Sequence, residues 1–339
     1  DGLLGNRSSA TKDQFQYVGS VFWDDSAQRI SLLLEHESER FNQTGPFFSG
    51  EGAGRDLKRV TDSVALEYRV DVTDSLTLAA SGRYDDNSEF DSAETLRFEA
   101  SYHVSDETRL RGAWGTAIKN PTFTERFAVF GFFVGNPNLI PEESTSWELG
   151  IDHALLNGRI NLGATIFNAE LENEINGFAA AAGGNSTAVN KEGFSQRQGV
   201  ELSSLATLGN NISIDVAYTY IDAVEFDSNS GQVVDETRRP RHSASANIAW
   251  QAASQWQLNA NVQYSGGQTD VFFPPWPAQA QTVSLDKYTL LNLNANYSAT
   301  ERLNIYVRLD NVLDDQYEEV LGYQTLGFGA SVGLRLKLR

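Results

Sequence analysis

Residues 212–220 read Ile-Ser-Ile-Asp-Val-Ala-Tyr-Thr-Tyr, with an apolar or aromatic side chain at every second position. Successive side chains of a β-strand point to opposite faces, so this period of two predicts a strand with one apolar face and one mostly polar face. The same alternation returns in residues 256–264, 291–297 and 303–309. Several of these stretches run for about ten residues, which is the length that a tilted strand needs to cross a bilayer.

The two faces differ in chemistry as well as in polarity. Asn, Gln, Ser and Arg recur on one face, whereas the apolar face often ends in an aromatic residue: Trp250, Trp256, Tyr264 and Tyr297. An apolar band with aromatic ends and a polar interior is typical of a transmembrane β-barrel. A soluble β-sandwich remains the alternative, because a sheet packed on one side also alternates.

The connections between the predicted strands alternate between short and long. Short turns fall near residues 24–26, 73–74, 105–106, 156–158, 209–211, 252–254 and 299–301. Longer connections fall near residues 42–56, 86–92, 119–144, 173–195, 226–237, 266–283 and 312–325. Bacterial outer-membrane barrels join their strands by short periplasmic turns and longer outer loops, so this pattern supports an all-β, antiparallel transmembrane barrel.

These connections separate about fifteen strands, whereas single-chain bacterial barrels usually have an even number. The first predicted strand covers residues 13–24 and runs into a short turn, which puts residues 1–12 on the outer side. We therefore expect residues 1–339 to be one domain, the C-terminal part of a larger barrel.

Composition limits the partners and the chemistry. The chain of 339 residues has a net charge of −19 and no cysteine, which argues against a nucleic-acid partner and excludes disulfides, iron–sulfur clusters and thiol nucleophiles. No apolar run approaches the roughly 18 residues of a membrane-spanning helix. Acidic residues gather in loops such as 85–89, 141–143 and 314–315. A calcium site among them stays open, although none has the spacing of a recognised calcium loop.

No pattern of catalytic or metal-binding residues stands out. The four histidines lie on separate predicted strands without paired spacing, which argues against a metal site: His36, His103, His153 and His242. The glycine-rich stretch 50–54 lacks the lysine and the flanking helix of a phosphate loop, so we interpret it as a flexible loop. No nucleophile motif is present, and we expect no enzymatic activity and no cofactor.

Aromatic residues cluster in two of the longer connections. Phe127, Phe130, Phe132 and Phe133 precede residues 135–139, and residues 272–276 read Phe-Phe-Pro-Pro-Trp. Apolar groups at this density either bind a ligand or pack against one another, and the sequence leaves both open.

Several motifs resemble the TonB-dependent outer-membrane receptors along essentially the whole chain. The motifs are residues 115–121 (Gly-Thr-Ala-Ile-Lys-Asn-Pro), 135–142 (Gly-Asn-Pro-Asn-Leu-Ile-Pro-Glu), Glu148, Gly150, Asn190, 199–202 (Gly-Val-Glu-Leu), 239–242 (Arg-Pro-Arg-His) and 311–317 (Asn-Val-Leu-Asp-Asp-Gln-Tyr). Within this family the chain is most similar to the members that transport cobalamin, through residues 86–90, 130–132 and 322–325. Siderophore or heme receptors share most of this framework and remain alternatives, as does a passive porin.

The resemblance implies an outer-membrane barrel of 22 strands with a plugged lumen, and uptake of a small nutrient powered by the TonB complex of the inner membrane. The plug is absent from these residues, and about seven strands of such a barrel would precede them. By position, the resemblance implies that Phe132, Phe133, Arg239 and Tyr323 contact the substrate. Family barrels usually end in an aromatic residue, and this chain departs from them by ending in Leu-Arg.

Overall fold

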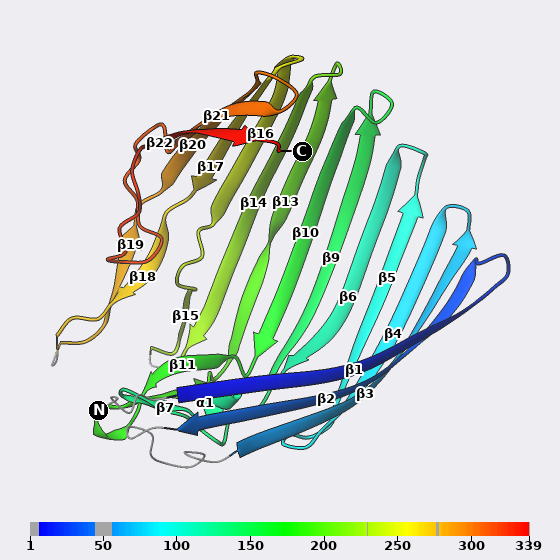
Figure 1. The fold of residues 1–339 in the computed structure, drawn as a ribbon. Coiled ribbons are helices and arrows are strands. Elements are labelled where there is room, and N and C mark those ends of the chain that lie inside the picture. Colours follow the sequence, from blue (N-terminus) through cyan, green and yellow to red (C-terminus); the bar gives the residue numbers. More distant parts are fainter. Residues whose placement is uncertain (1–6, 45–55, 229, 276–277, 339) are drawn as a thin grey trace.

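The computed structural model describes residues 7–44, 56–228, 230–275 and 278–338. Within these ranges, fifteen strands follow one another in a single antiparallel sheet, each paired with the next. They are β1 (Arg7–Trp23), β2 (Gln28–Thr44), β3 (Asp56–Thr73), β4 (Leu76–Asn87), β5 (Ala93–His103), β6 (Thr108–Lys119), β9 (Glu142–Leu155), β10 (Ile160–Glu172), β13 (Phe194–Leu208), β14 (Ile212–Asp227), β16 (His242–Ala253), β17 (Trp256–Ser265), β20 (Tyr288–Ser298), β21 (Leu303–Asp310) and β22 (Gly329–Leu336). The sheet curls into an arch with β1 and β22 at its edges, so it is part of a barrel wall (Figure 1). The predicted antiparallel order and strand number are confirmed.

Short turns join the strands at one end of the sheet, as predicted. Residues 24–26 of the β1–β2 turn and residues 156–158 of the β9–β10 turn all have positive φ. Left-handed backbone of this kind lets a tight hairpin follow the twist of its two strands, and it favours Asn, Asp and Gly. The turn residues alone therefore indicate where these hairpins reverse.

Near the N-terminus the first strand is longer than the sequence predicts. β1 begins at Arg7, earlier than the predicted start near residue 13, because β2 extends to Thr44 and supplies backbone partners to residues 7–12. Most of the predicted connection 42–56, including the glycine-rich stretch 50–54, lies outside the described residues.

The longer connections lie at the opposite end of the sheet (Figure 1). They carry the remaining elements: α1 (Phe123–Phe127), β7 (Val129–Phe130), β8 (Phe133–Val134), β11 (Ile175–Ala180), the 3-10 turn η1 (Ala182–Gly184), β12 (Ser186–Asn190), β15 (Gln232–Asp235), β18 (Gln268–Phe272) and β19 (Gln281–Leu285). Among the described residues, no helix combines the length and the apolar character needed to cross a membrane.

The apolar side chains of the strands are turned outward. Leu34, Leu66 and Leu149 are 46%, 52% and 56% exposed, respectively. Aromatic residues of this same face also lie close together. Phe98 and Trp114, and likewise Trp256 and Tyr297, pair across neighbouring strands, whereas Trp23 of β1 stacks on Tyr68 of β3 across β2. In the described chain no second sheet covers this apolar face, since the two smaller sheets are built from loop strands. The β-sandwich alternative is therefore wrong, and lipid is the solvent that suits such a surface.

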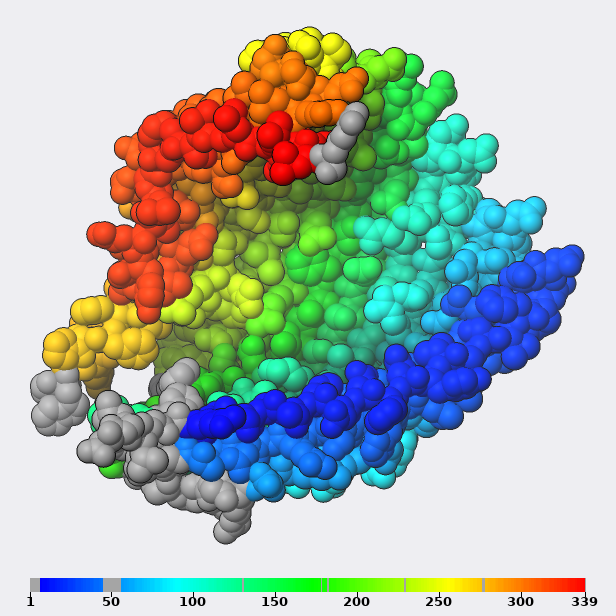
Figure 2. Space-filling model, in the orientation of Figure 1, coloured from blue at the N-terminus to red at the C-terminus, as the bar shows by residue number. Residues whose placement is uncertain are grey.

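Charged side chains fill the inner, concave face. Arg83 of β4 reaches across β3 to Glu35 of β2 at 2.8 Å. Arg111 of β6 likewise reaches across β9 to Thr165 of β10. Contacts that skip a strand are favoured where side chains converge, on the inside of a curved sheet. Figure 2 shows the hollow that this concave face encloses, with β1 in front and the green strands behind it.

Candidate functional site

The longer connections form a mouth at one end of the barrel wall. We use the term mouth for the described residues of connections 120–141, 173–193, 228–241, 266–287 and 311–328. Most of the buried apolar side chains of the described chain lie in the mouth, although most of the described residues belong to the sheet. The packed core of this protein therefore belongs to its mouth and not to its wall.

The connection 120–141 folds inward onto the outer ends of β2 and β3. The ring of Phe123 stacks on Phe41 with centroids 5.9 Å apart, and the Val129 amide donates to Gln43 Oε1 at 3.0 Å. The residues of this loop core are Phe41, Phe123, Ala128, Phe133, Leu139 and Ala188. It brings together one strand and two mouth connections, which fixes the shape of the mouth on this side.

Two arginines clamp the same connection around an aromatic ring. The guanidinium carbons of Arg59 and Arg126 lie 5.8 and 4.7 Å from the ring centre of Phe90. Arg59 Nη1 also donates to the Pro121 carbonyl at 2.8 Å, and Arg126 Nη1 pairs with Glu89 at 3.1 Å. Both arginines are buried. Desolvated cation–π contacts of this kind contribute about 2 kcal/mol each.

Asparagines of the quoted motifs hold one mouth connection to another. Asn136 donates through Nδ2 to the Ala188 carbonyl at 3.0 Å, and its own amide donates to the Glu125 carbonyl at 2.8 Å. Asn190 exchanges hydrogen bonds with both backbone groups of Ile140, at 2.9 and 3.0 Å. The motifs therefore include residues with a structural role, because their side chains satisfy backbone groups of the mouth connections.

Asn311 does the same at the end of β21. It has a φ of 45° and is 5% exposed. Its side chain accepts from the Asp315 amide at 3.1 Å and donates to the Asp315 carbonyl at 2.9 Å, while its own amide donates to Asn292 Oδ1 at 2.9 Å. An asparagine is suited to this place because it tolerates left-handed backbone and bonds its own chain locally.

Glu174 is the centre of an ion-pair cluster between two mouth connections and β13. It pairs with Arg197 at 2.9 Å and with Lys191 at 3.4 Å, and Ser195 Oγ donates to it at 2.6 Å. Burial by itself raises the pKa of Glu174. The hydrogen bond from Ser195 and the positive charges of Lys191 and Arg197 outweigh burial and hold that pKa below its ordinary value. Arg197 also pairs with Glu236 at 2.9 Å, which extends the cluster to the connection 228–241.

Asp270 joins three mouth connections. It is 1% exposed, and its carboxylate receives Arg238 Nε at 2.9 Å, the Leu321 amide at 2.8 Å and the Val271 amide at 2.7 Å. Burial by itself raises the pKa of Asp270, but these donors lower it below its ordinary value. The carboxylate therefore stays ionised inside the mouth.

The four predicted substrate contacts all stand in the mouth, on three connections. Phe132 and Tyr323 are 78% and 73% exposed, whereas Phe133 is 4% exposed and belongs to the loop core. Arg239 is half-exposed and lies 3.3 Å from Glu236. Phe133 is packed among the apolar residues of the loop core and is therefore less accessible than the other three. Substrate contact by the four residues stays a prediction.

The aromatic clusters divide into packed and exposed residues, and ligand contact by the exposed ones stays a prediction. Phe133 and Phe127 pack within the loop, whereas Phe132 and Phe273 are exposed. Asp270, Arg59 and the other clamping residues were not singled out from the sequence. Asp270 lies in the short stretch Gln268–Phe272, which carries none of the quoted motifs, and its burial depends on partners that are distant along the chain.

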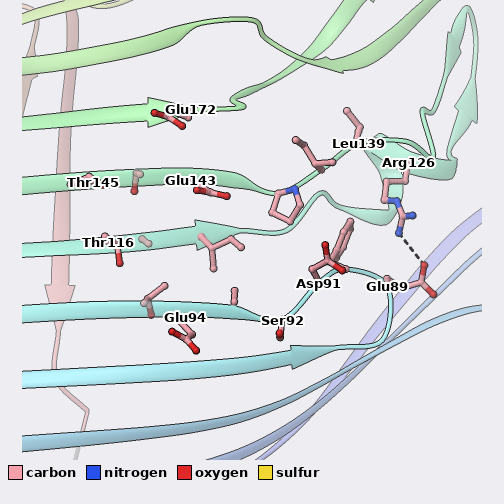
Figure 3. Close-up of a pocket in the computed structure, with 18 of the residues that line it drawn as sticks. Glu89, Asp91, Ser92, Glu94, Thr116, Arg126, Leu139, Glu143, Thr145 and Glu172 are labelled. Carbon is pink, nitrogen blue, oxygen red and sulfur yellow. Dashed lines mark hydrogen bonds and ion pairs between the residues drawn. The ribbon is translucent and has the colours of Figure 1, made fainter.

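A large acidic hollow of the described chain adjoins the mouth connection 120–141, which supplies Arg126 and residues 137–141 to its lining. It has a volume of about 1220 Å³ and lies between residues 88–92 and the outer ends of β5, β6, β9 and β10. Figure 3 shows the carboxylates that line it, Asp91, Glu94, Glu143 and Glu172, and the ion pair between Glu89 and Arg126. Within the described ranges, no three or more His, Asp or Glu side chains converge as metal ligands.

A family model and two curated relatives resemble this chain. Residues 4–312 match the family model described as TonB dependent receptor-like, beta-barrel. The vitamin B12 transporter BtuB of Photobacterium profundum is 31% identical over 240 residues, which cover 69% of this chain and 36% of the relative. The BtuB of Vibrio cholerae serotype O1 is 29% identical over 314 residues, covering 92% and 44%. The chain thus spans less than half the length of these relatives.

Solved structures share the fold at lower identity. The siderophore receptor PirA from Acinetobacter baumannii has a TM-score of 0.78 at 18% identity, with 98% of this chain and 55% of that chain covered. A mutant of the ferric enterobactin receptor PfeA from Pseudomonas aeruginosa has a TM-score of 0.75 at 18% identity, covering 96% and 54%. These likenesses establish the barrel architecture.

Proposed function

This chain belongs to the TonB-dependent receptor family, and from that premise we propose that it forms the barrel wall of a transporter for cobalamin or a related corrinoid. Barrels of the family lie in the bacterial outer membrane, and so does this one. The outward apolar face and the charged inner face suit that location.

The observation that carries the choice of ligand is sequence similarity. The curated relatives at 29–31% identity are named vitamin B12 transporters, and one of these alignments covers 92% of the chain. The solved siderophore receptors, at 16–18% identity, support only the fold. A siderophore receptor of the same family is therefore the competing assignment.

The electrostatics of the mouth support the same ligand class. Each arginine of residues 238–241 has a carboxylate partner: Arg238 has Asp270, Arg239 has Glu236, and Arg241 has Asp235. Their positive charge is therefore compensated, and the chain as a whole has a net charge of −19. Such a field does not attract a strongly anionic ferric chelate. A corrinoid is a large ring fringed by neutral amides, which suits exposed aromatic and paired polar groups.

The proposed mechanism has a capture step and a gated step. Exposed Phe132 and Tyr323 contact the ligand from two sides of the mouth, Arg239 supplies a hydrogen-bond donor, and Phe133 supports the hairpin of Phe132 from behind. A pore wide enough for a corrinoid would leak if it stayed open, so a plug must fill it and must move for passage. The energy for this movement comes from the TonB complex of the inner membrane, which is the proposed protein partner.

Direct binding tests this proposal. Cyanocobalamin is titrated into the full-length protein in detergent, in parallel with a ferric siderophore and with heme. We expect saturable binding of cyanocobalamin and no binding of the siderophore or heme. Phe132→Ala and Tyr323→Ala should each weaken cyanocobalamin binding about tenfold, as for aromatic contacts at other interfaces. Phe15→Ala is the matched control, because Phe15 is 73% exposed on the outward face of β1. Binding of the siderophore or heme without the corrinoid would overturn the choice of ligand.

A further inference from the structure

Asp270 is the largest fully buried side chain of the described residues, and it is charged. A buried carboxylate is unfavourable unless hydrogen bonds satisfy its oxygens. Here Arg238 contributes both Nε and Nη2 at 2.9 Å, and two backbone amides complete the set. Arg238 and the Val271 amide share Oδ1, whereas the Leu321 amide is the donor to Oδ2, so movement of the Leu321 connection would leave Oδ2 unsatisfied.

The partners of Asp270 adjoin the proposed ligand contacts. Arg238 directly precedes Arg239, and Leu321 lies two residues before Tyr323. Asp270 itself lies on β18, in a third connection. One carboxylate thus holds two connections that the sequence separates widely, and each of them presents a proposed contact next to the point of attachment.

Two further hydrogen bonds join the same connections. The Arg238 amide donates to the Thr269 carbonyl at 2.8 Å, and Gln268 Nε2 donates to the Glu319 carbonyl at 2.9 Å. Arg238 has a φ of 58°, in the left-handed region. A residue with a side chain is uncommon in such a conformation, and Arg238 combines it with the amide bond to Thr269 and the side-chain contact with Asp270.

We propose that Asp270 is a positioning residue for ligand capture, which holds the connections that carry Arg239 and Tyr323 in the arrangement that binds. This inference rests on the proposed function, because it takes Arg239 and Tyr323 as ligand contacts. Asp270 is too buried to reach a ligand itself, so its effect is transmitted through Arg238 and Leu321.

The first experiment measures loop order without a ligand. The 339 residues contain no cysteine, so introduced cysteines in this chain carry spin labels at chosen places. One label at exposed Asn210 in the β13–β14 turn serves as the fixed point, and the second is placed at Tyr323 or at Thr124 of α1. We expect Asp270→Asn to broaden the 210–323 distance distribution about twofold and to leave 210–124 unchanged, because α1 is held by other contacts.

Matched variants make this experiment decisive. Asp286→Asn removes the same charge from an exposed position that lines a hollow together with Arg239, and it should leave both distributions unchanged. Arg238→Gln keeps Asp270 but removes its charged partner, and it should broaden 210–323 to a smaller extent. It also provides a second test if Asp270→Asn is poorly assembled. An unchanged 210–323 distribution in both variants would overturn the inference.

The second experiment measures coupling to the ligand contacts in a double-mutant cycle with cyanocobalamin. Asp270→Asn should weaken binding about tenfold in the wild-type background, in the range of a lost charged hydrogen bond. In an Arg239→Ala/Tyr323→Ala background the same change should have little further effect, since the residues that it positions are gone. Equal weakening in both backgrounds contradicts a positioning role. If cyanocobalamin does not bind at all, the proposed function fails, and the label distances still decide whether Asp270 orders the mouth.

Discussion

Replacing Phe133 by alanine tests whether this residue packs or binds. Phe133 is 4% exposed in the loop core, and Phe→Ala changes in protein cores cost about 3–5 kcal/mol. The loop core is small, and its neighbours Leu57, Phe127 and Ile175 are only partly buried. We therefore expect a loss of stability near the lower limit of this range, about 3 kcal/mol. A change of about 1.4 kcal/mol is tenfold in an equilibrium constant, so the opened population of the connection should rise by roughly a hundredfold.

Hydrogen–deuterium exchange of the protein in detergent measures this opening. The reporting amides are those of Gly135, Asn136 and Ser186, which donate to the carbonyls of Ala128, Glu125 and Phe132 at 2.8 Å each. All three should exchange roughly a hundredfold faster in Phe133→Ala, within the limit set by global opening, while amides of the strands stay protected.

Phe132→Ala is the control, because its ring is exposed on the same hairpin and contributes little to the loop core. It should leave exchange unchanged and lower ligand affinity. If Phe133→Ala instead lowers affinity with no change in exchange, Phe133 contacts the ligand and the packing argument is refuted.

Three further predictions concern acid, lipid and backbone spacing. The pKa values of Asp270 and Glu174 lie below their ordinary values of 3.8 and 4.5, so their stabilisation is complete above those ordinary values and is lost as the pH falls toward the lowered pKa values of the folded protein. The protection factors of the loop amides, which are corrected for the pH dependence of intrinsic exchange, should stay constant from about pH 7 to 5 and fall below about pH 4. Leu149→Lys, on the outward face, should destabilise the barrel in lipid by about 2–4 kcal/mol, whereas Ser146→Lys, on the inner face, should be tolerated, as measured by urea unfolding in vesicles. Gly199→Ala should impair assembly, judged by protease resistance, because its Cβ would lie 2.1 Å from a backbone oxygen of β14.

The wall of the barrel could be predicted from sequence because its signals are local. Alternation in residues 212–220 predicts a strand and its two faces, and the turn residues at 156–158 indicate where the chain reverses direction. Each strand then pairs with the next, so no distant partner has to be found. The antiparallel order follows from these local features with little tertiary information.

The interior of the mouth could not be predicted in the same way. Phe132 and Phe133 are adjacent and identical in type, yet one is exposed and the other is buried, because the loop core lies on one side of their hairpin. Asp270 shows the same limit, since its partners Arg238 and Leu321 come from connections that only the folded wall brings together. Loops have no period, so partner choice there depends on tertiary contacts.

The separation of wall and mouth has a consequence for how such receptors diverge. Every hydrogen-bond register of the wall is set by strands that are neighbours in sequence, and the connections of the mouth enter and leave at the ends of those strands. An insertion or replacement in a connection therefore leaves the register intact. Solved receptor barrels that are only 16–18% identical to this chain share its architecture. Substitutions and insertions in the connections can thus change which ligand a receptor recognises, while the strand pairing on which assembly in the membrane depends is retained.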